Sequence, residues 1–320
     1  MFVFLLSVII RHVYIMRTNK RSNIRKHKKT RRRRGGSKGS PLACSPLVKK
    51  SDKVAQDSCI TKPVLMRLRN EFNKDHPENP IMATRPILIW HEFKMRLSHC
   101  ADERCFLNEI DEPSEKQRLL HTLFAPEHPP EWLQNKNEWL SNHDIDKVMK
   151  QYEERYADFK YLGTSAIDYD FKYSDGHCVE DQLCKFVLKE LMAAGKTRFA
   201  SVFNLDKHNQ GGSHWVSIFI DVKHKSVVFF DSAKGGIPKE IKRFVETIKD
   251  QGLKQDDPIK FKFLTNKSDH QQGDTECGVY SIHFIIEMLE SFKSVKRFLY
   301  GNITDKEMED LRPKLFNKPA

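Results

Sequence analysis

The strongest pattern of polar and apolar positions lies between Gln271 and Leu289, where a polar, glycine-containing loop meets a long apolar run. From Val279 onward, apolar residues recur every three to four positions, which is the spacing of a buried helix face. The polar residues directly before Cys277 favour the start of a helix. We therefore predict a buried helix that contains Cys277 in its first turn.

Helical and strand patterns alternate closely from residue 131 to the end of the chain. A helix is predicted within Glu131–Tyr156, beginning at Asn142 or Asp144, and runs of β-forming residues predict strands after it. The pattern indicates an α+β fold in which the helix of Cys277 packs against a small central mixed sheet. The other predicted helices are Val179–Ala194, Ile237–Gln251 and an amphipathic turn after Thr304, and the predicted strands are Arg198–Asn204, His214–Val222, Ser226–Asp231 and Ile259–Leu264.

The chain before residue 131 is less regular. A cluster of prolines from Pro126 to Pro130 marks a boundary before the main domain. We predict an apolar start and disordered polybasic tail in residues 1–40, a mostly helical accessory arm in 41–130, and the main domain in 131–320. The helical patterns of the arm lie at Val64–Phe72, Ile87–Leu97 and Glu115–Phe124.

Charge is distributed unevenly along the chain, which has a net charge of +12. Thirteen of the 55 lysines and arginines lie in residues 1–40, which contain no acidic residue, and the other 42 nearly balance 43 acidic residues. Residues 17–40 contain one apolar residue, so they are predicted to be disordered. Three roles fit this polycation: non-specific binding of nucleic acid through phosphates, a nuclear-import signal, or contact with an anionic membrane.

Residues 2–16 are mainly apolar, but the uninterrupted run is about half the length that spans a bilayer. The segment lacks the basic start and the small-residue cleavage site of a signal peptide. It is interpreted as an interaction segment or as an upstream extension with translation starting at Met16, in preference to a weak membrane contact.

Seven cysteines are spaced irregularly and form no C-x-x-C pair. This spacing predicts neither a disulfide framework nor a zinc ribbon, and it favours a reducing, intracellular setting. Two Cys–His groups do not fit the spacing of structural zinc sites, so no metal or other cofactor is predicted. These groups are His99 with Cys100 and Cys105, and His177 with Cys178 and Cys184.

A cysteine in the first turn of a helix has a specific chemistry. The helix dipole and the free backbone N–H groups stabilise a thiolate at Cys277 and so favour a nucleophile. The alternative is a buried cysteine that only packs in the core, as free cysteines often do. A hydrolase would also need a base and an orienting group.

His214 and Asp231 are candidates for these two roles. His214 begins one predicted strand and Asp231 ends the next, so a tight antiparallel connection brings imidazole and carboxylate together. The carboxylate would fix the ring tautomer, and the other ring nitrogen would face Cys277. Each residue also has an ordinary interpretation, as a surface histidine at a strand end and as a strand-to-turn aspartate.

Gln271 lies just upstream of the nucleophile, so its side-chain amide and the N–H of Cys277 are candidate donors to an oxyanion. Gln272 is an alternative donor, and His270 is an alternative base. The order His–Asp–Gln–Cys, with each residue at the edge of the right element, favours nucleophilic catalysis.

Two motifs carry a family resemblance: HW-x5-D with FFDS following it, and Q-x5-CG opening a helix. Over roughly residues 135–312 the chain resembles the adenain-like cysteine peptidases, which include proteases of SUMO and other ubiquitin-like proteins, adenovirus protease and proteases of large DNA viruses. It is particularly similar to the African swine fever virus polyprotein protease, in the TECG motif and in an ending like ITDKEMEDLRPKLF.

The resemblance implies a papain-like fold of the adenain type, with His214 as base, Asp231 as orienter, Gln271 as oxyanion donor and Cys277 as nucleophile. Trp215 would cover a narrow substrate channel. Trp139 lies in a segment similar to the family's WLND motif, from which this sequence departs at Ser141 and Asn142.

The resemblance also implies a substrate. Family members cut near Gly-Gly sequences, because glycine alone is thin enough for the channel. The leading hypothesis is a thiol endopeptidase that matures viral structural polyproteins in the virion and the host cytoplasm. The alternatives are a peptidase that deconjugates SUMO or another ubiquitin-like protein, and a nucleic-acid-binding protein with a decayed protease fold. Self-cleavage at Gly35-Gly36 is a further hypothesis.

Overall fold

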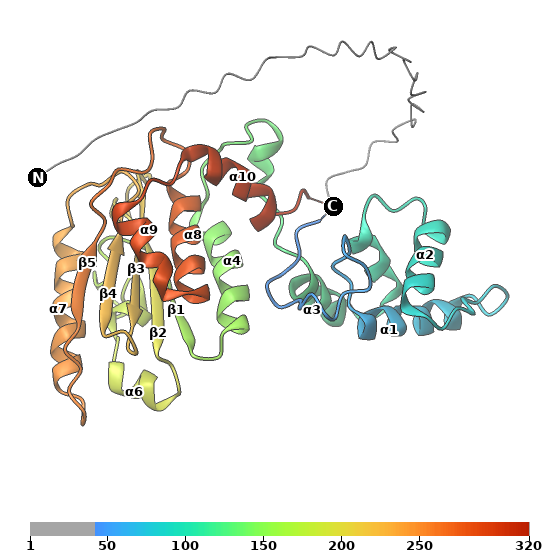
Figure 1. The fold of residues 1–320 in the computed structure, drawn as a ribbon, viewed down its shortest axis with the longest axis horizontal. Coiled ribbons are helices and arrows are strands. Elements are labelled where there is room, and N and C mark those ends of the chain that lie inside the picture. The colour runs from blue at the N-terminus through green and yellow to red at the C-terminus, as the bar shows by residue number, and fades with distance from the viewer. Residues whose placement is uncertain (1–41, 320) are drawn as a thin grey trace, which may run out of the picture. The chain divides into compact units, whose positions relative to one another are not determined.

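The computed structural model describes residues 42–319 (Figure 1). The chain divides into two units, residues 1–39 and 40–320, and the description below concerns the second. The predicted apolar start in residues 2–16 and polybasic tail in residues 17–40 lie outside the described residues, as does the hypothetical cut at Gly35-Gly36.

A five-stranded mixed sheet forms the centre of the domain, with its strands in chain order across the sheet. The central strand is antiparallel to both of its neighbours, and each edge strand is parallel to the strand beside it. The predicted mixed sheet is therefore confirmed. The strands are β1 (Phe159–Ala166), β2 (Arg198–Asn204), β3 (Trp215–Asp221), β4 (Ser226–Phe230) and β5 (Lys262–Thr265).

Helices cover both faces of this sheet (Figure 1). In β4, side chains pack alternately on the two faces of the sheet. Val228 and Phe230 belong to one core cluster, and Val227 and Phe229 belong to the other. A strand that is buried on both faces has a continuous run of apolar residues in its sequence. The first cluster is covered by α8 (Cys277–Glu290), α4 (Asn142–Arg155), α9 (Val295–Tyr300) and α10 (Asp305–Leu315), and the second by α5 (Asp181–Cys184), α6 (Leu188–Ala193) and α7 (Lys239–Leu253).

Two predicted elements differ from the structure. The single helix over Val179–Ala194 is wrong, because the chain there forms the two short helices α5 and α6. Between them the Gln251 side chain accepts from the Leu188 N–H at 2.6 Å and donates to the Phe186 carbonyl at 2.9 Å, so these backbone groups bond outside any helix. The last predicted strand, Ile259–Leu264, is shifted to β5, and β1 was missed.

The accessory arm is helical, as predicted, with its own apolar core. At the centre of this core the Glu103 carboxylate accepts hydrogen bonds from Trp90 Nε1, Ser58 Oγ and the Cys59 N–H. Burial raises the pKa of Glu103, and these three donors oppose that rise. The helices are α1 (Lys62–Asp75), α2 (Pro86–Arg96), the short η1 (Glu103–Glu109) and α3 (Pro113–Leu123).

Six of the seven cysteines form disulfides, so the expectation of no disulfide framework is wrong. Every cysteine lies within the described residues, and Cys277 is the free one. The Cα atoms of each pair lie between 5.2 and 6.3 Å apart. The bonds close short loops of irregular length, which is why spacing alone did not indicate them. The pairs are Cys44–Cys59, Cys100–Cys105 and Cys178–Cys184.

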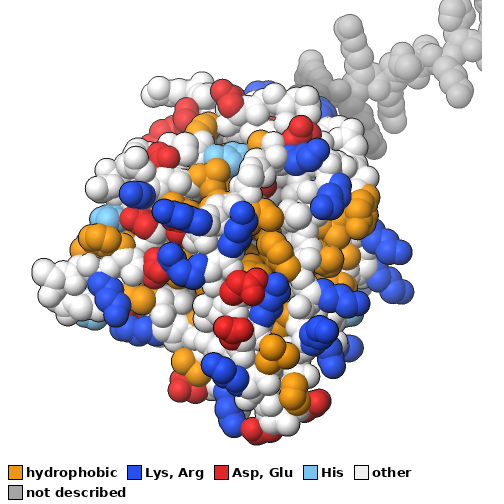
Figure 2. Space-filling model, turned by 90° about the vertical axis from the view of Figure 1, so that its left-hand side faces the viewer, with side chains coloured by type: hydrophobic (Ala, Val, Ile, Leu, Met, Phe, Trp, Pro, Cys, Tyr) orange, Lys and Arg blue, Asp and Glu red, His pale blue; other side chains and the backbone are white. Residues whose placement is uncertain are grey.

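Among residues 42–319, no helix combines the length and the apolar character that crossing a bilayer requires. Lys and Arg side chains are interspersed with Asp and Glu on the side of the domain that Figure 2 views.

Candidate active site

Cys277 is the first residue of α8 and so lies in the first turn, as predicted. Its side chain is buried, with 1% of the residue exposed. The next residue has to be small, since a Cβ at Gly278 would lie 3.2 Å from Leu140 Cβ and 3.4 Å from Trp215 Cδ1. The free thiol therefore lies at a helix start, and Leu140 before α4 and Trp215 in β3 lie close to the residue that follows it.

His214 and Asp231 meet at one end of the antiparallel pair β3–β4. His214 directly precedes β3 and Asp231 directly follows β4, and His214 Nε2 lies 2.7 Å from Asp231 Oδ1. The carboxylate also accepts from the backbone N–H groups of Ala233 and Gly235, at 3.0 and 2.6 Å. These three donors fix the carboxylate so that it holds the imidazole in one orientation.

The surroundings of this pair favour its charged form. Burial lowers the pKa of His214, but hydrogen bonds to Asp231 and Cys277 and the charges of both partners outweigh burial and raise it to about 9. Burial raises the pKa of Asp231, and the hydrogen bonds from His214 and the backbone more than offset it, so the net shift is downward. The structure thus brings His214 together with both Asp231 and Cys277.

Two polar residues that the sequence analysis missed hold this end of the sheet. Asn266 follows β5, and its amide donates to the Asp231 carbonyl at 2.7 Å and accepts from the Asp231 N–H at 3.2 Å. The Ser232 carbonyl accepts from the N–H groups of His270 and Gln271 at 2.9 and 3.0 Å. The loop before Cys277 is therefore paired with the residue that follows Asp231.

Gln271 is buried, and its side chain has a fixed orientation. Its Oε1 accepts from Ser232 Oγ at 2.7 Å, which assigns the other end of the amide as the donor. Nε2 donates to the Gly273 carbonyl at 2.9 Å. An amide nitrogen carries two N–H groups, so one remains to act as an oxyanion donor.

The alternative base, His270, has both ring nitrogens occupied. Nδ1 accepts from the Ile303 N–H at 3.1 Å, and Nε2 lies 2.8 Å from the Phe298 carbonyl. Burial lowers the pKa of His270. Both contacts suit a neutral ring that joins two backbone segments, so His270 has a structural role.

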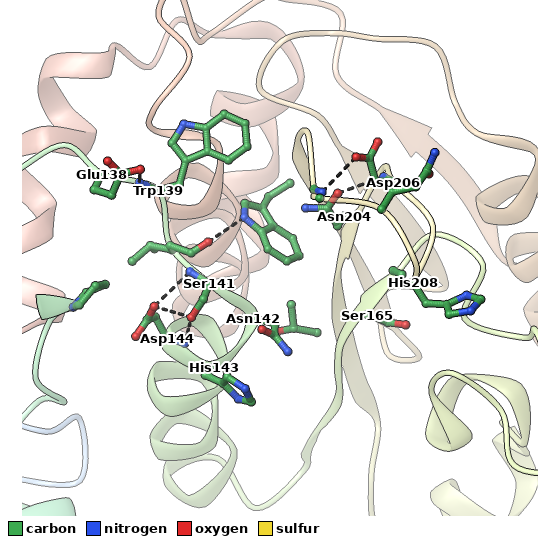
Figure 3. Close-up of a pocket in the computed structure, with 18 of the residues that line it drawn as sticks. Glu138, Trp139, Ser141, Asn142, His143, Asp144, Ser165, Asn204, Asp206 and His208 are labelled. Carbon is green, nitrogen blue, oxygen red and sulfur yellow. Dashed lines mark hydrogen bonds between the residues drawn. The ribbon is translucent and has the colours of Figure 1, made fainter. Parts of the chain in front are cut away.

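A groove of about 820 Å³ lies between the start of α4 and the ends of β1 and β2, and neither Cys277 nor His214 is among the residues that line it. Figure 3 shows Trp139 and Asn142 on one side of it and Asn204, Asp206 and His208 on the other. Trp139 and Trp215, which the sequence predicted as channel residues, both line the groove.

The wall of this groove includes Ser141 and Asn142, the two positions at which this sequence departs from the WLND motif. Ser141 forms a capping box with Asp144 at the start of α4, each side chain bonding the other's backbone N–H. Trp215 Nε1 donates to the Leu140 carbonyl at 3.0 Å. The short segment after Trp139 is therefore held by Trp215 at Leu140 and by the capping box at Ser141.

Two known families match this chain. The Ulp1 protease family, C-terminal catalytic domain, matches residues 203–319, which include all four candidate catalytic residues. The Vaccinia virus I7 processing peptidase family matches residues 93–258. A protein of Acanthamoeba polyphaga mimivirus that is named as a thiol protease is 30% identical over 229 residues, which is 69% of each chain. The chain belongs to the Ulp1-like cysteine peptidases.

A second viral relative is named as a SUMO-1 cysteine protease, from African swine fever virus. It is 30% identical to this peptidase over 185 residues, which cover 55% of this chain and 67% of that protein. The crystal structure of the African swine fever virus protease matches with a TM-score of 0.62 at 24% identity, covering 88% of this chain and 97% of that chain. This likeness shows that the fold is shared.

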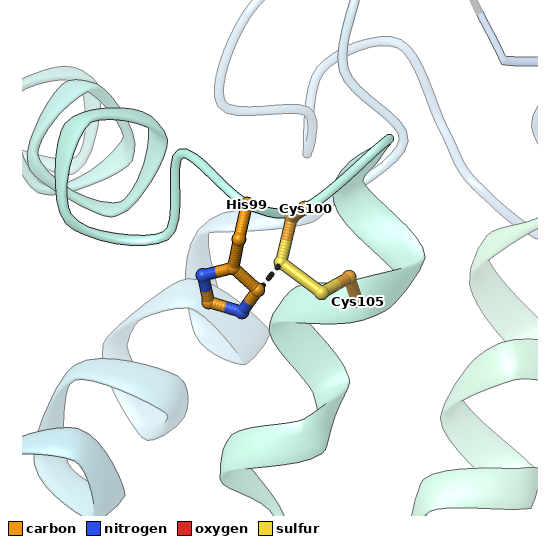
Figure 4. Close-up of side chains that lie close together, drawn as sticks. All are labelled: His99, Cys100 and Cys105. Atoms are coloured by element: carbon orange, nitrogen blue, oxygen red, sulfur yellow. Dashed lines mark hydrogen bonds between the residues drawn. A yellow bond between two sulfur atoms is a disulfide. The ribbon is translucent and has the colours of Figure 1, made fainter.

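A separate cluster in the arm of this peptidase, His99 with Cys100 and Cys105, has three ligand atoms within 4.8 Å of one another. Figure 4 shows the two sulfurs joined as a disulfide, and a ring nitrogen of His99 lies 3.8 Å from Cys100 Sγ. Zinc binds cysteine as thiolate. The disulfide and a metal therefore exclude each other at this place.

Proposed function

We propose that this Ulp1-like peptidase is an endopeptidase that cleaves at Gly-Gly-containing sites, and that it matures viral structural polyproteins. One observation carries the proposal: the free thiol is nearly fully buried and lies within hydrogen-bond reach of His214, which is paired with Asp231. A substrate backbone without side chains reaches such a sulfur more readily than any other.

The proposed mechanism assigns one role to each residue. The Cys277 thiolate attacks the carbonyl carbon of the glycine before the cut, and His214 as imidazolium then gives its proton to the leaving amine. Asp231 keeps the ring oriented. The N–H of Cys277 and the amide of Gln271 stabilise the oxyanion, and water releases the acyl group with His214 as base.

A peptide with a Gly-Gly-X sequence tests the proposal directly. The wild-type chain is expected to cut after the second glycine, and Cys277→Ala to abolish cleavage while leaving the melting temperature unchanged. A peptide with Ala-Ala in place of Gly-Gly is the matched substrate control. Turnover by Cys277→Ala at the wild-type rate would end the proposal.

Deconjugation of SUMO or another ubiquitin-like protein is the second candidate. It is favoured by the printed name of the African swine fever virus relative and by the match to the Ulp1 family. A ubiquitin-like protein with a C-terminal vinyl sulfone reacts with a catalytic thiol only when its folded body also binds. Covalent labelling of Cys277 by that probe would support deconjugation, whereas cleavage of the short peptide without labelling supports the endopeptidase.

We further propose that the enzyme acts in the virion and the host cytoplasm and that residues 17–40 bind nucleic acid non-specifically. A membrane contact through residues 2–16 is the less favoured role of that segment. Gly35-Gly36 lies next to the basic run, so self-cleavage there would release the tail. An N-terminal mass that is unchanged after incubation of the active enzyme would exclude self-cleavage.

A further inference from the structure

Helix α10 contacts both ends of the segment that carries the candidate oxyanion donor and leads to the nucleophile. This segment, residues 271–276, is called the nucleophile loop here. The helix begins with a capping box between Thr304 and Glu307, which fixes its first turn. Its two ends then reach the loop through one acidic and one basic side chain.

Asp305 holds the first half of the loop. Its Oδ2 accepts from the N–H groups of Gln272 and Gly273 at 3.0 and 2.7 Å. Its Oδ1 accepts from the hydroxyl of Tyr280, one turn after the nucleophile, at 3.0 Å. One carboxylate therefore joins the backbone next to Gln271 to the first turn of α8.

Arg312 holds the second half of the loop. Its Nε donates to Glu276 Oε2 at 2.8 Å, and Nη2 donates to the Thr275 carbonyl at 2.9 Å. Arg312 and Glu276 are 3% and 2% exposed. The pair thus fixes the two residues directly before Cys277 in a place that excludes water.

The same guanidinium also reaches the segment that leads into the groove wall. Nη1 donates to the Glu138 carbonyl at 2.8 Å, directly before Trp139, and the guanidinium lies 4.4 Å from the centre of the Trp132 ring. A lysine could not replace these contacts, because its single ammonium lacks the planar fork of five donors. A buried ion pair contributes little net stability, so we interpret this pair by the geometry that it fixes.

We propose that α10 is a brace that sets the position of the nucleophile loop, with Asp305 and Arg312 as positioning residues. The inference rests on the proposed function for its kinetic readout. Asp305 contacts the loop and Tyr280 of α8, whereas Arg312 contacts the loop and the segment that leads into the groove wall. The two residues should therefore affect catalysis and substrate binding differently.

The experiment compares Asp305→Asn and Arg312→Lys in the full chain with a Gly-Gly-X peptide. Because a displacement of about 1 Å costs roughly 10²-fold in rate, Asp305→Asn is expected to lower kcat by about that factor with KM unchanged. Arg312→Lys is expected to lower kcat similarly and also to raise KM. The matched controls are Asp310→Asn and Arg243→Lys, which alter exposed ion pairs that contact neither the loop nor the groove and should change neither constant.

Alkylation of Cys277 by iodoacetamide separates positioning from folding. A displaced loop slows alkylation of the folded protein and shifts its pH profile, at an unchanged melting temperature. The brace would be overturned if both variants had the kcat, the KM and the alkylation rate of the wild type. It would also be overturned if the loss of activity in each variant equalled the fraction of protein that is unfolded. If the wild type cleaves no Gly-Gly peptide, the proposed function fails, whereas the alkylation comparison still decides the brace.

Discussion

At the scale of single residues, the proposed mechanism depends on a proton that stays on His214. The ring accepts stabilisation from a buried carboxylate on one side and from the thiol on the other, and together they raise the pKa of His214 to about 9. A general acid with that pKa remains protonated through neutral pH. The arrangement therefore favours an imidazolium that can donate to a leaving amine.

The basic limb of the pH–rate profile tests this assignment. For the wild type, kcat/KM for a Gly-Gly-X peptide is expected to fall as pH rises through about 9, because His214 then loses its proton. Asp231→Asn removes one of the contacts that raise this pKa, so the fall should begin at lower pH. The control is Asp221→Asn, which alters another His–Asp pair, with His224, at the opposite end of β3. An identical basic limb in wild type and Asp231→Asn would contradict the assignment.

The same shift predicts a change in stability with pH. Because folding raises the pKa of His214 from 6.5 to about 9, its contribution is fully present below pH 6.5 and is lost as pH rises through 9. The free energy of unfolding of the wild type should therefore fall over this window, relative to His214→Gln. Urea titrations at pH 6, 7.5 and 9 measure the free energy of unfolding of both proteins. The same dependence of this free energy on pH in the wild type and in His214→Gln would exclude the predicted contribution.

Gln271 offers a comparison with its neighbour in sequence. Gln271→Ala should lower kcat by about 10²–10³-fold with little change in KM, since an oxyanion donor acts mainly in the transition state. Gln272→Ala removes the same amide from an exposed position and should leave kcat unchanged. Equal effects of the two substitutions would show that Gln271 is no oxyanion donor.

At the scale of elements, the sequence predicted those whose pattern is continuous. β2 was placed at its observed bounds, and Cys277 was placed in the first turn of α8, because most residues of each element are buried. β1 was missed because Gly163 interrupts it at a register shift between Tyr161 and Thr164. Gly163 has a φ of +93°, and a Cβ there would lie 2.7 Å from the Glu180 carboxylate, so its position requires glycine.

The candidate catalytic set was predictable in part for the same reason. His214, Asp231 and Cys277 lie at the edges of regular elements, so the spacing of those elements predicts where they meet. Asn266 and Arg312 gave no such signal, because the partners they hold at the site, Asp231 and Glu276, are 35 and 36 residues away. Contacts of this kind depend on the tertiary fold, which periodicity does not specify.

The packing of α8 on the sheet makes a stability prediction. Phe284 is fully buried, stacks on Phe230 with ring centres 5.0 Å apart and contacts Phe298 edge-on at 5.2 Å. Phe284→Ala should lower the free energy of unfolding by about 3–5 kcal/mol, because it leaves a cavity under the nucleophile helix. Phe292→Ala is the control, since Phe292 is half-buried and stacks on His224 at the surface. Urea unfolding measures both, and a loss below about 1 kcal/mol for Phe284→Ala would contradict this packing argument.

At the scale of the whole molecule, charge separates the tail from the rest of the chain. Residues 41–320 carry nearly equal numbers of acidic and basic side chains, and both signs are mixed on the surface that Figure 2 shows. Residues 1–40 carry 13 basic side chains and no acid. Non-specific attraction to a polyanion should therefore arise from the tail and leave the catalytic site unchanged.

Deletion of residues 1–40 tests this separation. With Cys277→Ala in every protein to prevent self-cleavage, the full chain should bind duplex DNA with an affinity that falls steeply as salt rises, because each neutralised phosphate releases counterions. The shortened chain should lose most of this affinity and its salt dependence, as should a full-length variant with Gln in place of the basic residues of 17–40. In the active background, all three proteins should cleave the Gly-Gly-X peptide at equal rates. Salt-sensitive binding that survives in the shortened chain would place the nucleic-acid contact on the folded domain instead.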